Sequence, residues 1–127
     1  MADELFTRGL AVRKQVMGSE EVDRRLAHAD RYTRMVEEME TEVVWGMVFS
    51  RPGIPTKVRL MINLALMTAL NREDELREQM RAALANGVTK DEVVEVLLQA
   101  NAYCGGPAGV EAFRVIREVF AETAPQR

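Results

Sequence analysis

The sequence predicts an all-α fold, a single-domain bundle of about six to seven helices. First, no stretch of useful length alternates between apolar and polar residues as a half-buried strand does. Second, apolar residues recur at helical spacing, for example through residues 93–104. Third, glycine and proline punctuate the chain, most clearly at 50–55. The length of 127 residues favours one domain, which we assign to 1–127 with its core at about 10–122.

The composition excludes several classes of protein. Apolar residues make up 47% of the chain, charged residues 29%, and the net charge is −3, an ordinary globular balance. The absence of a basic block argues against a nucleic-acid partner. No window approaches 18 uncharged apolar residues and the N-terminus has no secretory pattern, so we expect neither a membrane span nor export. A lone Cys104 and a lone His28 exclude an internal disulfide and a His-rich metal site. We therefore expect a cytoplasmic protein.

Capping residues mark the ends of the expected helices. Gly18 and Gly87 are typical helix stops, while Ser19 and Asn71 are expected to cap the helices that follow them. The tract Thr89–Glu92 is a capping box. The expected helices cover 3–17, 19–35 (continuing or breaking briefly into a third that ends near 49), 56–70, 72–86, 90–104 and 107–122, with a frayed tail at 124–127.

Two of these helices carry the main functional signals. The helix at 56–70 is apolar nearly all round, which places it in the centre of a bundle or at a subunit interface. The helix at 90–104 presents Gln99 and Tyr103 four residues apart, on one face. A buried amide or phenol costs about 1–3 kcal/mol when it is left unpaired. These side chains therefore face either a partner helix or a ligand.

Several tracts together resemble the carboxymuconolactone decarboxylase family. The resemblance extends over about 10–120, and its most specific part is the tract Trp45-Gly46 followed by Arg51-Pro-Gly53. The other matching tracts are Lys57-Val-Arg59, 75–88 and 95–107. The resemblance implies an alkyl hydroperoxidase D-like helical fold that assembles as a homo-oligomer, a trimer or hexamer. It also implies decarboxylation, without cofactor or metal, of a small carboxylated lactone in aromatic catabolism.

This sequence departs from the family pattern at the positions where histidine is usual. The wider superfamily includes thiol peroxidases with Cys-x-x-Cys-x-x-x-His, but the corresponding residues 72–79 hold neither cysteine nor histidine, which excludes that chemistry. Glutamine stands at 79 and 99, where decarboxylases usually have one histidine and often a second. Glutamine donates and accepts hydrogen bonds but does not transfer a proton at neutral pH.

The expected site contains cations and hydrogen-bond donors. We expect Arg51 and Arg59 to bind the substrate carboxylate. The alternative is a surface arginine for Arg51 and a salt bridge to an acidic neighbour for Arg59. For Lys57 we prefer a salt bridge to an acidic neighbour. We expect Gln79, Gln99 and Tyr103 to position the ring and to stabilise negative charge in catalysis. The alternatives are solvent exposure for Gln79, an interhelical hydrogen bond for Gln99 and a packing role for Tyr103.

The remaining candidates lie in the first half of the chain. Glu42 is the nearby carboxylate nominated for proton transfer, although a solvated helix glutamate is the common outcome. Trp45, three residues later, shares its face in an α-helix and is expected as a pocket wall or core residue. His28 is the only ordinary proton shuttle, either exposed or reaching a neighbouring subunit's pocket. Asn63 is expected to be a structural amide.

Three functions remain open from the sequence. The preferred one is an enzyme, a carboxy-lyase that acts on a 4-carboxymuconolactone-like substrate. The second is a divergent family member that catalyses a related dehydration or isomerisation in specialised metabolism. The third is a non-catalytic paralogue that binds a small acid or scaffolds an assembly, which the two glutamines favour.

Overall fold

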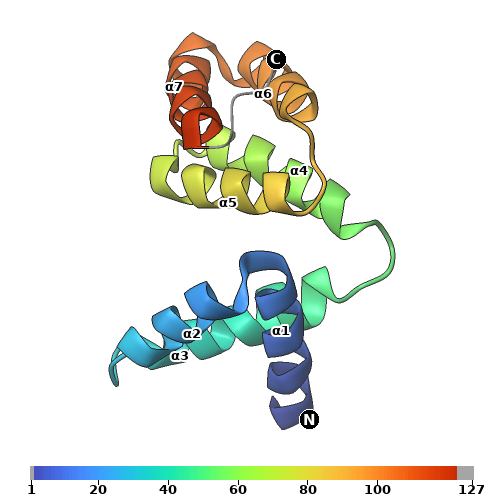
Figure 1. The fold of residues 1–127 in the computed structure, drawn as a ribbon, viewed down its shortest axis with the longest axis vertical. Coiled ribbons are helices and arrows are strands. Elements are labelled where there is room, and N and C mark those ends of the chain that lie inside the picture. Colours follow the sequence, from blue (N-terminus) through green and yellow to red (C-terminus); the bar gives the residue numbers. More distant parts are fainter. Residues whose placement is uncertain (1, 123–127) are drawn as a thin grey trace. The chain divides into compact units, whose positions relative to one another are not determined.

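The computed structural model describes residues 2–122, which form helices joined by short loops (Figure 1). These residues contain no strand, so the predicted all-α class is confirmed. The chain divides into two compact units, Met1–Ile54 and Pro55–Arg127, called unit 1 and unit 2 below. The boundary lies in the proline- and glycine-containing tract that was expected to break the helices. Assignment of the whole chain to one domain stays a prediction, and the tail 124–127 lies outside the described residues.

Unit 1 contains α1 (Ala2–Met17), α2 (Ser19–His28), α3 (Arg34–Glu40) and a π-helix, η1 (Thr41–Phe49), which continues α3 directly. A helix was expected to run past His28 to about Met35, or to break. It breaks, because the Asp30 carboxylate accepts hydrogen bonds from the backbone N–H groups of Tyr32 and Thr33, both at 2.9 Å. A short acidic side chain that binds the backbone in this way competes with the helix.

Helices α1 and η1 cross closely within unit 1. A Cβ atom on Gly9 would lie 2.0 Å from the backbone oxygen of Thr41, so only glycine allows this approach. One turn further along α1, the buried guanidinium of Arg13 donates to the Thr41 hydroxyl at 2.9 Å and to the Glu37 carboxylate at 2.7 Å. A buried arginine needs such pairing. The contacts fix α1 against the junction at which the α-helix becomes π-helical.

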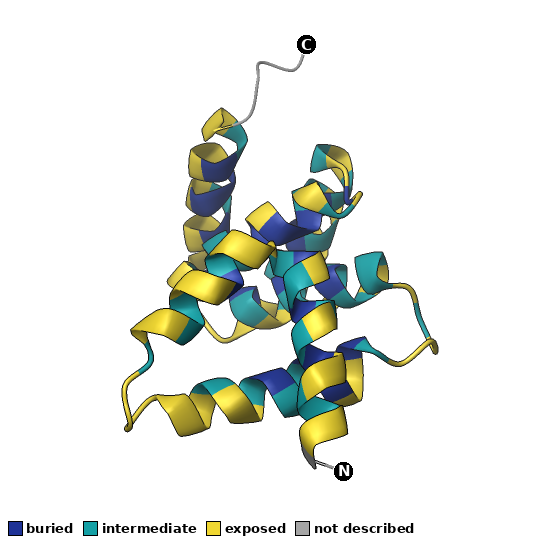
Figure 2. Cartoon of the chain, turned by 60° about the horizontal axis from the view of Figure 1, so that its bottom comes forward, coloured by how far each residue is buried: buried dark blue, intermediate teal, exposed yellow. Residues whose placement is uncertain are grey.

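Unit 2 contains α4 (Thr56–Ala69), α5 (Glu73–Ala85), α6 (Lys90–Cys104) and α7 (Gly106–Glu122). Helix α4 contacts the other three helices of the unit, as expected for its apolar composition. The core is formed by fully buried side chains from all four helices, and Figure 2 shows that the buried part of α7 lies along one side. Residues 2–122 hold no helix with the length and hydropathy needed to cross a membrane.

Some predicted caps are confirmed and others are wrong. Thr89 and Glu92 form the reciprocal capping box, and Gly87 ends α5 with a φ of 93°. Ser19 was expected as a cap, but Gly18 occupies that position and no side-chain cap forms. Asn71 was expected to cap α5, but it ends α4 instead, with a φ of 57°. Arg72 N–H donates to Met67 O and Asn71 N–H to Thr68 O, the Schellman pattern, which Asn tolerates.

Candidate active site

A polar cluster lies on the side of α4 that faces α5 in unit 2. Asn63 of α4 donates from Nδ2 to Oε1 of Gln79 on α5 at 3.1 Å, and both side chains are half-buried. Arg59, also half-buried, precedes Asn63 by four residues and therefore shares its face of α4. We call Arg59, Asn63 and Gln79 the amide–arginine cluster. It offers a cation and amide hydrogen-bond donors, the groups that bind a carboxylate.

The charged neighbours of Gln79 on α5 face away from this cluster. Arg77 and Arg81 are each two residues from Gln79, which turns them to the far side of the helix. There they pair with α7, Arg77 with Glu118 at 2.8 Å and Arg81 with Glu122 at 2.6 Å. The Arg81 hydrogen bond lowers the pKa of Glu122 below its ordinary value. Solvent exposure was the alternative considered for Gln79, because it lies on a charged helix. In the structure Gln79 is half-buried against α4.

A larger hollow lies between α4 and α6. Its volume is about 410 Å³, within the range of ligand pockets in proteins. Gln99 and Tyr103 both line it, as their shared face predicted, and both are exposed, Tyr103 to 86%. No charged side chain is among its lining residues. The remaining walls are aliphatic and come from Val58, Met61, Ile62, Ala65, Val96 and Ala100.

Helix α4 separates the hollow from the amide–arginine cluster. Met61 and Ala65 line the hollow, whereas Asn63 stands two residues from each of them. Residues two apart on an α-helix project from nearly opposite sides. The structure therefore divides the unit 2 candidates into two groups, Arg59 with Gln79 and Gln99 with Tyr103.

An ion pair joins the starts of α4 and α6. Lys57 lies 3.0 Å from Glu92, so the salt bridge expected for Lys57 is present. Glu92 also accepts the backbone N–H of Thr89 at 2.9 Å. These contacts, first the Thr89 N–H and then Lys57, hold the pKa of Glu92 below its ordinary value. Lys57 thus has a structural partner at the end of the hollow.

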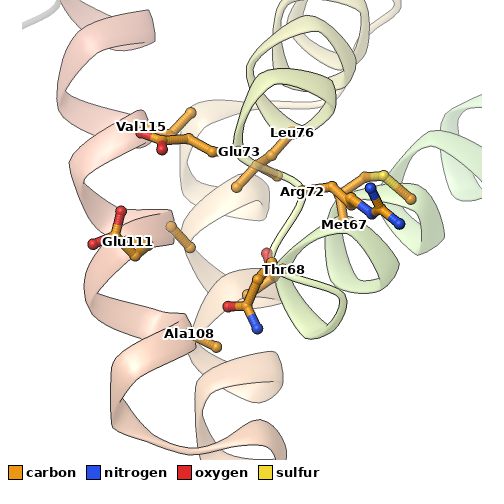
Figure 3. A pocket seen from close by; sticks show the side chains of 10 residues that line it. Met67, Thr68, Arg72, Glu73, Leu76, Ala108, Glu111 and Val115 are labelled. Carbon is orange, nitrogen blue, oxygen red and sulfur yellow. The ribbon is translucent and has the colours of Figure 1, made fainter.

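A second, smaller pocket lies at the C-terminal end of α4. Figure 3 shows Ala108, Glu111 and Val115 of α7 on one side and Thr68 and Arg72 on the other. Its volume is about 70 Å³, which suits a few water molecules rather than a substrate. We therefore do not assign the reaction to this pocket.

The unit 1 candidates sit in different surroundings. Trp45 is 3% exposed and packs against Phe49, with ring centroids 4.5 Å apart and ring planes tilted by 41°, so it is a core residue of unit 1. Glu42 is half-buried and does not share the face of Trp45, because i→i+5 bonding in the π-helix widens each turn. The expectation that they share a face is wrong for that reason. π-Helical turns are often found at functional sites.

The other two unit 1 candidates are exposed. Arg51 lies in the tract after η1. His28 is the last residue of α2, and its Nδ1 lies 2.8 Å from the backbone oxygen of Arg24. The exposed histidine matches one of the two environments considered for it.

Sequence reasoning missed two features of the structure. Asn63 was treated as structural only, although an amide in an apolar helix was itself the signal that could have paired it with Gln79. Arg13 gave no signal, because its burial depends on Glu37 and Thr41, more than 20 residues away in the chain.

The family model described as "Carboxymuconolactone decarboxylase family" matches residues 30–118. The chain belongs to the carboxymuconolactone decarboxylase family. The match includes η1 of unit 1 and all the unit 2 candidates, so it spans both units.

Two relatives of this chain are named for a decarboxylase activity. A 4-carboxymuconolactone decarboxylase of Acinetobacter baylyi is 38% identical over 127 residues, covering 98% of this chain and 95% of the relative. A nitrosuccinic acid decarboxylase of Metarhizium robertsii is 41% identical over 116 residues, covering 91% of this chain and 81% of the relative. The resemblance stated from the sequence is therefore confirmed.

Proposed function

We propose that this protein is a decarboxylase that acts, without a cofactor, on a small carboxylated lactone such as 4-carboxymuconolactone. The observation that carries the proposal is the 38% identity with a relative named for that activity over 98% of the chain. The identity with this relative extends over both units, and each unit contains candidate site residues.

The chemistry of this reaction sets what the site must supply. Cleavage of the carbon–carboxylate bond leaves an electron pair that moves through the conjugated lactone onto its carbonyl oxygen. The site must hold the spectator carboxylate, exclude water from the leaving one, and donate hydrogen bonds to the developing oxyanion. A proton must then be returned to carbon.

The amide–arginine cluster fits the first and third of these requirements. We assign the spectator carboxylate to Arg59, whose guanidinium can bind both of its oxygens. The amide N–H₂ group of Gln79 then donates to the oxyanion, the role of a preorganised donor rather than of an acid. For unit 1 taken by itself, Arg51 as a carboxylate ligand, Glu42 as a proton donor and His28 as an alternative shuttle stay predictions, while Trp45 lies in the core of that unit.

Gln99 and Tyr103 take a different place in this proposal. They line the uncharged hollow, so we do not assign the substrate carboxylate to them. The family resemblance also carries the proposal of a homo-oligomer. A row of exposed apolar side chains on α4 supports it, formed by Val58, Ile62, Leu66 and Leu70.

A second substrate is favoured by a specific observation. The relative named nitrosuccinic acid decarboxylase is 41% identical over 91% of this chain. When a carboxylate leaves the carbon next to a nitro group, the electron pair moves onto the nitro oxygens. Negative charge again develops on oxygen beside a spectator carboxylate. Arg59 would therefore bind the carboxylate and Gln79 would donate to the charged oxygen, as proposed for the lactone.

The test is turnover of both compounds by the purified protein. Loss of the 4-carboxymuconolactone absorbance and release of carbon dioxide from nitrosuccinic acid would be followed in the presence of a chelator. We expect one substrate to be turned over with a kcat/KM of about 10⁴ M⁻¹ s⁻¹ or more. Absence of turnover of both at micromolar enzyme would overturn the proposal. Activity gained in the Gln79→His variant would then indicate a lapsed decarboxylase.

A further inference from the structure

The hydrogen bond between Asn63 and Gln79 fixes which edge of the Gln79 amide faces outward. A carboxamide has an acceptor edge, the oxygen, and a donor edge, the N–H₂ group. Asn63 Nδ2 donates to Gln79 Oε1 at 3.1 Å, so the acceptor edge is turned toward α4. Among the residues that the structure describes, no hydrogen-bond acceptor is recorded for the N–H₂ group. Gln79 therefore presents a donor edge.

The donor edge and the guanidinium of Arg59 belong to the same cluster. Arg59 stands one helical turn before Asn63 on the same face of α4. A guanidinium and an amide N–H₂ group are both donors, and a carboxylate has acceptor sites for both. If Gln79 were turned by half a rotation, its oxygen would face the anion and repel it. The orientation of this one amide thus decides whether the cluster attracts or opposes an anion.

We propose that Asn63 is a positioning residue, which holds Gln79 with its N–H₂ group toward an oxyanion or carboxylate bound at Arg59. Asn63 acts through Gln79 and does not itself touch the substrate. This inference rests on the proposed function for the identity of the substrate. The ligand class that it names, a small dicarboxylate, can be tested by binding without turnover.

Three substitutions at one position test the orientation. Asn63→Asp replaces the donor by an acceptor, so the Gln79 N–H₂ group turns inward to it and the Gln79 oxygen turns outward. Asn63→Leu removes the donor without adding charge, which leaves Gln79 able to rotate. Asn63→His keeps a ring N–H close to the place of Nδ2 and should rescue the orientation.

The readouts are the KM and kcat of the substrate and the inhibition constant of succinate, a dicarboxylate with no group to lose. We expect Asn63→Asp to raise KM and the succinate inhibition constant by about tenfold or more, the effect of losing a hydrogen bond to a charged group. Asn63→Leu should raise them less, and Asn63→His should stay within about threefold of the parent protein. A residue with a merely structural role would instead change the melting temperature in step with these constants.

Leu66→Asp is the matched control for the added negative charge. Leu66 is exposed on α4, one turn from Asn63, so it brings the same charge close to the cluster. Size-exclusion chromatography checks that both aspartate variants keep the oligomeric state of the parent protein. An equal loss in Leu66→Asp and Asn63→Asp would overturn the inference, because charge alone would then explain it. Parent-like constants in Asn63→Asp would also overturn it. With either of these two outcomes, turnover of the substrate by the parent protein would still support the proposed function. If the parent protein neither turns over a substrate nor binds succinate, both fail.

Discussion

The two sides of α4 present opposite kinds of surface. Toward α5 lies the amide–arginine cluster, with a cation and oriented amide groups. Toward α6 lies the hollow of about 410 Å³, whose walls are aliphatic apart from one amide and one phenol. Size alone would select the hollow as the substrate site, but charge selects the cluster. An anion left without a cation in an apolar hollow loses its hydration without compensation. The difference teaches that the charge of the proposed substrate, rather than the volume of a cavity, favours the cluster as its binding site.

The largest effect is expected from Arg59. Because it supplies the cation in the cluster, Arg59→Ala should lower kcat/KM by about 100-fold, mostly through KM. Lys57→Ala is the matched control, since Lys57 is already paired with Glu92 and should change kcat/KM by less than about threefold. Steady-state kinetics with both variants measures the contrast. Equal losses in the two variants would mean that α4 contributes only a general positive potential.

A smaller effect is expected from the two glutamines, which stand on opposite sides of α4. Gln79→Ala should lower kcat by roughly tenfold or more, because it removes a donor to the oxyanion. Gln99→Ala should leave kcat/KM within about threefold, since Gln99 is exposed in the uncharged hollow. A larger loss in Gln99→Ala than in Gln79→Ala would reverse the comparison and place the reaction in the hollow.

The smallest effect concerns stability at the hollow's end. The Thr89 N–H and Lys57 lower the pKa of Glu92 in the folded protein, so this carboxylate stabilises the fold above its ordinary pKa of 4.5. The contribution is lost as the pH falls through the lowered value. Glu92→Gln keeps an acceptor for Thr89 but loses the ion pair with Lys57.

We therefore expect Glu92→Gln to melt slightly below the parent protein at pH 7, and the difference to shrink as the pH falls below 4.5. Thermal melts followed by circular dichroism measure the difference, and kcat at pH 7 should not change. A difference in melting temperature that persists at the acid end would show that the ion pair is not its cause.

Local sequence signals predicted most of the fold correctly. Gly87 and the Thr89–Glu92 capping box ended and started helices as expected, because a positive φ and a reciprocal cap are properties of a few adjacent residues. The same reasoning failed for Asn71, which ends α4 instead of starting α5. Asn suits both positions, and only the Schellman hydrogen bonds of Arg72 and Asn71 distinguish them.

The candidate site was predictable as a set of residues but not as an arrangement. The pairing of Gln99 with Tyr103 on one wall follows from their four-residue spacing, and the Lys57 salt bridge was also expected. Gln79 lies away from Gln99 and Tyr103, against Asn63 of α4. This placement depends on how α5 packs on α4, which no local sequence pattern predicts. The π-helical turn that separates Glu42 from Trp45 likewise has no local marker in the sequence.

By itself, the sequence determined the helical class, the helix ends marked by Gly18, Gly87 and Thr89, and the family, because each depends on residue identity and short-range spacing. Only the tertiary structure decided that Asn63 donates to the Gln79 amide oxygen, and that Gln99 and Tyr103 line a hollow between α4 and α6. The physical reason is that a helix surface acquires its role from the neighbour that packs on it. Residues far apart in the chain, such as 63 and 79, meet only after that packing is set.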